Sequence, residues 1–105
     1  MLDVGVIHHL KDVIVSVVPA RRIILFGSRA AANATPESDI DILIIVDDTT
    51  DGLRQLRQAL HVEISSLVAI PCDVLVEHKS TFVERSSLPT MERAIRRSGI
   101  SLYAA

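Results

Sequence analysis

The chain has 105 residues, of which 49% are hydrophobic and 23% charged, and its formal net charge is −2. This length fits a single domain over residues 1–105, and the composition excludes intrinsic disorder. The slight negative charge excludes the strongly basic surface of a dedicated nucleic-acid-binding protein, so a nucleic-acid partner is not expected.

The cysteine count and the apolar segments of the chain bear on the cellular localisation of the protein. The single cysteine, Cys72, excludes an internal disulfide bond, which suits a reducing compartment. The N-terminal residues lack the basic start and unbroken apolar core of a signal peptide. No apolar run approaches the roughly 18 residues that span a membrane. We therefore expect a cytoplasmic protein without a membrane partner.

The first third of the chain predicts one helix and one strand. Apolar residues recur with helical spacing over residues 3–17, which indicates an amphipathic helix that Pro19 ends. Residues 21–26 are typical of a short buried strand, closed by Gly27. Ser28 is expected to cap a brief helix that follows.

The middle of the chain predicts strand, helix and strand. Residues 39–46 are rich in β-branched side chains and largely apolar on both faces, which indicates a central strand covered on both sides. A turn at residues 47–52 leads into a helical stripe that runs to residue 67. Residues 72–77 then form a third predicted strand.

The last third predicts two short helices and an edge strand. Thr81 with Glu84 resembles a capping box, Thr90 is expected to cap a second helix, and Gly99 to end it. Residues 100–103 alternate like an edge strand. The resulting order, αβ(α)βαβααβ, predicts an α/β (α+β) two-layer fold in which helices flank a small sheet.

Carboxylates mark the beginnings of two predicted strands. Asp39 and Asp41 are two residues apart and so share a face, and Asp73 begins the next strand. Carboxylates held this close repel one another unless a cation lies between them, and rigidly held oxygen ligands suit Mg²⁺. The alternative is that they are solvated charges at a strand end.

The helix between these two strands favours convergence of the three carboxylates. It is the crossover that a parallel pair requires, and parallel neighbours begin at the same edge of a sheet. The preceding strand must then run antiparallel to strand 39–46, because its end has to reach that strand's start. The sheet is therefore predicted to be mixed.

Gly27 and Ser28 suggest a second element of chemistry. A glycine lets backbone N–H groups approach a ligand, and a serine that opens a helix adds a hydroxyl, a combination suited to phosphate. The alternative is an ordinary turn. Beside a carboxylate cluster, a phosphate-binding turn indicates phosphoryl or nucleotidyl transfer with two metal ions.

These motifs resemble the nucleotidyltransferase superfamily related to DNA polymerase beta. The resemblance is strongest to the minimal nucleotidyltransferases, small prokaryotic proteins usually encoded beside a HEPN-domain partner in a toxin–antitoxin pair. It rests on Gly27-Ser28-Arg29-Ala30, Ser38-Asp39-Ile40-Asp41 and Asp73.

The resemblance implies a role for each matching position. Asp39 and Asp41 would bind Mg²⁺, and Asp73 would bind a second ion and help to activate the attacking hydroxyl. The triphosphate of ATP would be held by Gly27, Ser28 and Arg29. For Arg29, a solvated surface arginine is the alternative.

One departure from the family pattern lies in the loop after Arg29. Many members have a basic residue and a second glycine where this chain has Ala31 and Ala32. The loop is therefore expected to be less positive and less flexible.

The resemblance also implies a function. The protein would transfer a nucleotide, AMP from ATP, to a hydroxyl of a HEPN-type toxin and form a hetero-oligomer with it. The sequence offers no second domain to hold an acceptor, which favours a partner protein in that role. Two alternatives stay open: a non-catalytic antitoxin that neutralises its partner by occlusion, and a nucleotidyltransferase acting on a small molecule such as an antibiotic.

Other candidates have simpler interpretations. The Asp47–Gly52 segment resembles half of an EF-hand loop but lacks the preceding helix and the final glutamate. The four histidines lack zinc-site spacing, and Cys72 is expected to be a small core residue. The basic C-terminal region is interpreted as solvated helix faces, with an acidic partner or nucleic acid as the alternative; its arginines are Arg85, Arg93, Arg96 and Arg97.

Overall fold

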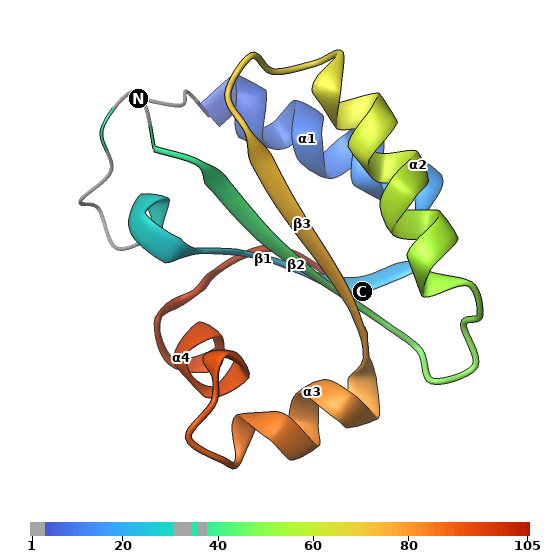
Figure 1. The fold of residues 1–105 in the computed structure, drawn as a ribbon, viewed down its shortest axis with the longest axis vertical. Helices are drawn as coiled ribbons and strands as arrows, with labels where there is room; N and C mark the ends of the chain where they lie inside the picture. Colours follow the sequence, from blue (N-terminus) through green and yellow to red (C-terminus); the bar gives the residue numbers. More distant parts are fainter. Residues whose placement is uncertain (1–3, 31–34, 36–37) are drawn as a thin grey trace.

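Within the described residues, four strands form one mixed sheet, and helices cover both of its faces (Figure 1). The computed structural model describes residues 4–30, 35 and 38–105. The order confirms the predicted fold class and series of elements. In chain order the elements are α1 (Val4–Val17), β1 (Ala20–Phe26), the 3-10 helix η1 (Gly27–Arg29), β2 (Ile40–Val46), α2 (Leu53–Ser65), β3 (Cys72–His78), α3 (Lys79–Ser86), α4 (Met91–Ser98) and β4 (Ile100–Ala104).

The strand order β3-β2-β1-β4 places β2 and β1 at the centre of the sheet. β2 pairs in parallel with β3, and β1 pairs antiparallel with both β2 and β4, which confirms the predicted mixed sheet. Helix α2 supplies the crossover that the parallel pair needs. As a result, β2 and β3 begin at the same end of the sheet, and β1 ends there.

The face of the sheet that packs against α1 and α2 holds the larger hydrophobic core. Side chains alternate along a strand, so the even-numbered residues of β2 all point to this face. Each fully buried leucine or isoleucine stabilises the fold by about 1.5–3 kcal/mol. The residues of this core with the lowest exposure include Leu10, Ile14, Ile23, Ile40, Ile42, Ile44, Val46 and Leu60.

No helix in the described ranges is long and apolar enough to cross a membrane.

The opposite face carries a smaller core under α3 and α4. Phe82 of α3 and Ile95 of α4 pack there against Leu43 and Ile45 of β2. These two short helices add a third layer to the expected two, as Figure 1 shows. Since Leu43 and Ile45 are odd-numbered, the alternation also directs Asp41 to this face.

The N-terminus of α3 is not formed as the sequence suggests. The helix begins at Lys79, so Thr81 lies inside it and the predicted Thr81–Glu84 capping box is wrong. Instead, Asp48 from the loop after β2 accepts a hydrogen bond of 3.0 Å from the backbone N–H of Ser80. A side chain distant in sequence thus caps the helix, which local patterns do not reveal.

Helix α4 follows its prediction more closely. The Thr90 hydroxyl accepts from the backbone N–H of Arg93 at 3.3 Å, and the helix ends just before Gly99. An ion pair from Arg85 of α3 to the buried Glu92 joins the two helices. Arg85 is therefore a structural member of the basic C-terminal group rather than a free surface charge.

Candidate active site

Carboxylates meet where β2 and β3 begin. Asp41, the second residue of β2, is the register partner of Asp73, the second residue of β3. Asp39 lies one residue before β2, and the alternation of side chains places it on the same face as Asp41. Neighbouring strands are about 4.8 Å apart, so the three residues share one edge of the sheet.

The charge of these carboxylates is not matched by the rest of the described chain. Asp39 and Asp73 are exposed and Asp41 is half-buried. Burial raises the pKa of the Asp41 carboxyl, and the negative charges of Asp73 and then Asp39 raise that pKa further. Among the described residues, none of the three forms an ion pair or a side-chain hydrogen bond. A cation bound between these carboxylates would therefore reduce their mutual repulsion.

Gly27 lies directly against Asp41. Its φ is +76°, a left-handed conformation that side chains disfavour. A Cβ atom at this position would overlap Oδ2 of Asp41 and come within 3.2 Å of its Cγ. Glycine is thus required twice, for the backbone angle and for the space. The contact places the predicted phosphate-binding turn beside the carboxylates.

Ser28 and Arg29 occupy the short helix η1. Phe26, not Ser28, takes the N-terminal capping position, so the expectation that Ser28 caps this helix is wrong. The Arg29 guanidinium donates from Nε and Nη2 to the carbonyl oxygen of Ser38, at 3.1 and 2.6 Å. Arg29 is therefore only partly exposed to solvent, and its guanidinium holds the residue before Asp39 in place.

The loop between η1 and β2 is described only in part. The Thr35 backbone N–H donates a hydrogen bond to the Ser38 hydroxyl at 2.9 Å. The predicted departure at Ala31 and Ala32 lies outside the described residues.

We call the end of the sheet that carries Asp39, Asp41 and Asp73 the acid edge. Its carboxylates suit a hard divalent cation, but they do not form a complete set of ligands. Carboxylate oxygens are the donors that Mg²⁺ prefers, and Mg²⁺ sites commonly combine one or two carboxylates with substrate phosphates. In the described part of the chain, no three histidine, cysteine or acidic side chains are grouped to hold one ion. The residues present therefore fit a cation that is bound partly by these carboxylates and partly by phosphate oxygens of a ligand.

A pocket of about 440 Å³ opens beside Asp73, between β3 and α2. Arg54, Arg57 and His61 of α2 line it on one side, and Asp73 borders it on the other. The two arginines are three residues apart, so they lie on one face of the helix. They are absent from the predicted site, although this spacing on a predicted helix was a usable signal.

The aspartates of the loop after β2 have structural roles. Asp47 forms an ion pair of 2.9 Å with Arg21, and Asp48 caps α3. His78 is held by Thr50, since its Nε2 lies 2.7 Å from the Thr50 carbonyl oxygen. These contacts give the EF-hand-like segment a role in joining β1, β2 and α3.

Cys72 lies beside the larger core, as predicted for a small apolar residue. Burial raises the pKa of its thiol to about 11, and the charges of Asp73 and Asp41 contribute to the increase. The thiol is therefore protonated at neutral pH and unsuited to be a nucleophile.

Fold and site together define an α/β domain that carries an acidic sheet edge next to a glycine-serine turn. The family described as nucleotidyltransferase domain matches residues 8–100, nearly the whole chain. This chain belongs to that family, whose members typically use a nucleoside triphosphate and a divalent metal ion. No curated protein matches the chain significantly.

Solved structures show the same fold at low sequence identity. A toxin–antitoxin crystallised with AMP-PNP is 19% identical, with a TM-score of 0.63 over 93% of this chain and 73% of that one. A mutant of the MntA-HpeT toxin–antitoxin is 20% identical, with a TM-score of 0.62 over 100% of this chain and 75% of that one. A putative nucleotidyltransferase from Sulfolobus solfataricus is 18% identical, with a TM-score of 0.61 over 95% and 78%.

Proposed function

We propose that this protein is a Mg²⁺-dependent nucleotidyltransferase that transfers AMP from ATP to a hydroxyl group of a partner protein. The partner is a HEPN-type toxin, and the transfer neutralises it, so the protein acts as an antitoxin. Family membership supports nucleotide transfer in general. We propose in addition that the nucleotide is ATP, the metal ion is Mg²⁺ and the acceptor is the toxin.

One observation carries the proposal: Asp41 lies between Asp73 on the next strand and the backbone of Gly27. This contact brings acidic groups and a turn with space for phosphate to the same point. Carboxylates gain nothing for the fold by lying unpaired at a strand edge, and their repulsion disfavours it. A triphosphate with its cation would relieve that repulsion, which makes nucleotide binding the favoured explanation.

The metal ions would be held by Asp39 and Asp41, with Asp73 contributing to the second. When bound, they supply charge neutralisation for the triphosphate and for the attacking oxygen. Gly27 leaves its side of the turn open to phosphate, and the Ser28 hydroxyl adds a hydrogen-bond donor.

The transfer itself is a single displacement at phosphorus. The acceptor oxygen forms a bond to the α-phosphorus of ATP, and the bond from that phosphorus to the oxygen bridging to the β-phosphate breaks, so pyrophosphate leaves. Asp73 takes the proton of the acceptor hydroxyl, because it is exposed at the start of an edge strand that an acceptor can approach.

A protein acceptor is supported by two further observations. Similar solved structures include toxin–antitoxin proteins, one of them with AMP-PNP. In addition, the pocket beside Asp73 has Arg54 and Arg57 in its wall. Their positive charge favours an acceptor segment with acidic side chains near the reactive hydroxyl. The two proteins would form a hetero-oligomer at this edge.

The test is incubation with ATP labelled at the α-phosphate, Mg²⁺ and the protein encoded by the adjacent gene. We expect label on that protein, and we expect the Asp39→Ala/Asp41→Ala variant to abolish it. The matched control is Asp48→Ala/Asp51→Ala, which removes two carboxylates from the loop after β2 and should retain transfer.

Two results would contradict the proposal. Neutralisation of the partner by Asp39→Ala/Asp41→Ala without any label transfer would indicate occlusion by binding alone. Transfer of label only to small hydroxyl compounds, with none on the partner, would indicate a small-molecule nucleotidyltransferase.

A further inference from the structure

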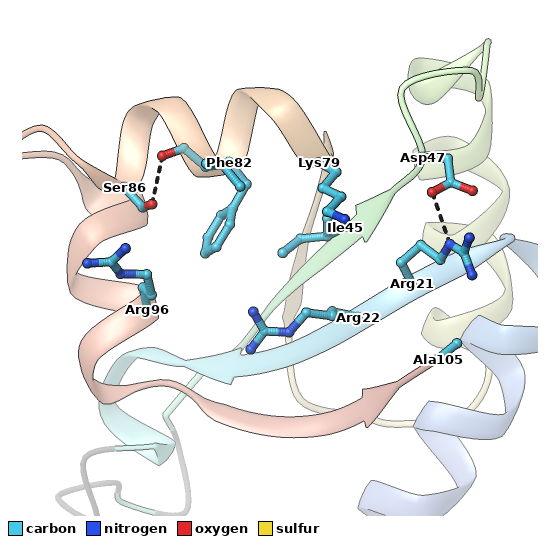
Figure 2. Close-up of a pocket in the computed structure, with 10 residues that line it drawn as sticks. Arg21, Arg22, Ile45, Asp47, Lys79, Phe82, Ser86, Arg96 and Ala105 are labelled. Carbon is cyan, nitrogen blue, oxygen red and sulfur yellow. Dashed lines mark hydrogen bonds and ion pairs between the residues drawn. The ribbon is translucent and has the colours of Figure 1, made fainter.

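We propose that a second pocket, at the opposite end of the sheet from the acid edge, binds a small phosphorylated anion. This basic pocket has a volume of about 400 Å³ and is lined by the cations Arg22, Lys79 and Arg96, by the Arg21–Asp47 ion pair, and by the apolar side chains of Phe82 and Ile45. In Figure 2, Lys79 and Phe82 are directed from α3 toward the sheet, Arg22 lies over β1, and Arg96 comes from α4.

The basic pocket is separate from the candidate active site. Along the β1–β2 pair, Arg22 is the register partner of Ile45, whereas Phe26 is the partner of Asp41. Asp41 and Ile45 are four positions apart on β2, so the two sites are about 13 Å apart along the strand. Both lie on the face covered by α3 and α4, so one sheet face carries an acidic end and a basic end.

The cationic side chains that line this pocket outnumber its carboxylate side chains. Arg21 forms an ion pair with Asp47, which also lines the pocket, but Arg22, Lys79 and Arg96 form no ion pair within the described part of the chain. This concentration of positive charge occurs in a protein whose net charge is −2. Three like charges directed at one hollow repel one another, and an anion would remove that repulsion.

Arg22 also breaks the pattern of its strand. Ile24 of β1 is buried in the smaller core, and Arg22 is two residues away on the same face. Arg22 is exposed and lines the pocket, so the apolar pattern of this face of β1 ends there.

A β-bulge accompanies this departure. The register shifts between Ala20 and Arg22, so one extra residue, Arg21, is accommodated in β1. Bulges redirect side chains and are frequent beside binding sites. Here the bulge brings Arg21 and Arg22, adjacent in sequence, to the border and lining of the same pocket.

Size and chemistry identify the class of ligand. A pocket of this volume fits a small molecule rather than a macromolecular surface. Guanidinium groups match the oxygens of phosphate in a bidentate manner, and several cations favour a ligand with at least two negative charges. The apolar wall can contact the body of a phosphate ester.

We would test the proposal by nuclear magnetic resonance titration of the ¹⁵N-labelled full chain with two probes, inorganic pyrophosphate and phenyl phosphate, in the presence of EDTA. We expect saturable shifts of the Ile45, Phe82 and Ser86 amide signals. Arg96→Gln should weaken binding by at least about tenfold. The matched control is Arg97→Gln, the adjacent arginine on α4, which does not line the pocket and should change the affinity by less than twofold.

Each probe distinguishes one source of phosphate. Tighter binding of phenyl phosphate supports a phosphate ester, and tighter binding of pyrophosphate supports an inorganic phosphate. Arg22→Gln provides a second variant, with the same loss expected, should Arg96→Gln unfold. The same titration of Asp39→Ala/Asp41→Ala should give unchanged affinity, which separates this pocket from the candidate active site.

Three results would overturn the proposal. The first is the absence of saturable shifts at the pocket amides. The second is an equal loss of affinity in Arg96→Gln and Arg97→Gln, which would indicate general attraction of anions to the surface. The third is binding of poly-glutamate at these amides without binding of either phosphate probe, which would indicate a docking surface for an acidic protein.

Discussion

Two aspartates lie at the start of strand β2, Asp39 just before it and Asp41 within it, and Asp47 and Asp48 follow its end. The pair at the end is built into the fold: Asp47 forms an ion pair with Arg21, and Asp48 caps α3. The pair at the beginning has no such contacts among the described residues, and the pKa of Asp41 is raised. The same residue type thus forms contacts within the fold at one end of β2 and is without such contacts, among the described residues, at the other.

The largest expected effect is on catalysis. Asp41→Asn removes the charge of a proposed metal ligand and should lower the proposed nucleotidyl transfer by about 10²–10³-fold, which corresponds to several kcal/mol of transition-state stabilisation. Asp48→Asn makes the same change at the other end and should leave the rate within about twofold. The measurement is the initial rate of label transfer at saturating ATP. Equal losses in both variants would remove the distinction between the two ends.

A second comparison uses two glycines with similar backbone angles. Gly27 and Gly52 have φ values of +76° and +69°, but only at Gly27 would a Cβ overlap a neighbour, the Asp41 carboxylate. Alanine at either position should cost about 1–2 kcal/mol of stability. Only Gly27→Ala should also impair transfer, by about tenfold or more, because it displaces Asp41. Chemical denaturation and transfer assays measure the two effects, and full activity of Gly27→Ala would contradict the assigned contact.

Stabilisation of the protein by Mg²⁺ and ATP should depend on the aspartates at the start of β2. With ATP present, Mg²⁺ should raise the melting temperature of the wild-type protein by about 5–10 °C, which corresponds to roughly 1–2 kcal/mol for a domain of this size. Asp39→Ala/Asp41→Ala should lose this increase, and EDTA should reverse it in the wild type. An equal increase in the variant would indicate that the cation binds elsewhere.

The smallest effects concern pH, and they have opposite signs. The hydrogen bonds from Ser80 lower the pKa of Asp48 from 3.8, so its contribution to stability is present above that pH and is lost as the pH falls through the lowered pKa. The pKa of Asp41 is raised from 3.8, so the folded state favours its protonated form, and stability is lost as the pH rises through the raised pKa.

Melting curves of the metal-free protein between about pH 3 and 6 would check this difference. Asp48→Asn should flatten the acid side of the stability profile, and Asp41→Asn should flatten the side above pH 3.8. Changes of the same sign in both variants would show that the two ends are electrostatically alike.

Much of the fold could be predicted because it follows from local patterns. The apolar faces of β2 indicated a central strand, and the helix that follows it favoured a parallel partner because it can serve as the crossover. If the two strands were parallel neighbours, Asp41 and Asp73 would lie together at their beginnings. The register pairs them directly, which is why the edge of the sheet could be located from the sequence.

What the sequence did not reveal depends on contacts between distant segments. The caps of α3 illustrate this, since Thr81 fits a local capping pattern but Asp48 supplies the cap. In the same way, Arg29 looked like a ligand for phosphate, and its contact with the Ser38 carbonyl needs three-dimensional structure to be seen. The basic pocket is built from several separate elements, so no single segment predicts it.

The reactivity of Cys72 should depend on whether a cation is bound at the acid edge. Its pKa of about 11 arises from burial and from the negative charges of Asp73 and Asp41. A cation bound to those carboxylates would cancel part of their charge, lower the thiol pKa and increase the fraction of thiolate. The rate at which iodoacetamide alkylates this single cysteine should therefore rise with Mg²⁺ and ATP, so a covalent labelling rate would report occupancy of the site in the unmodified protein.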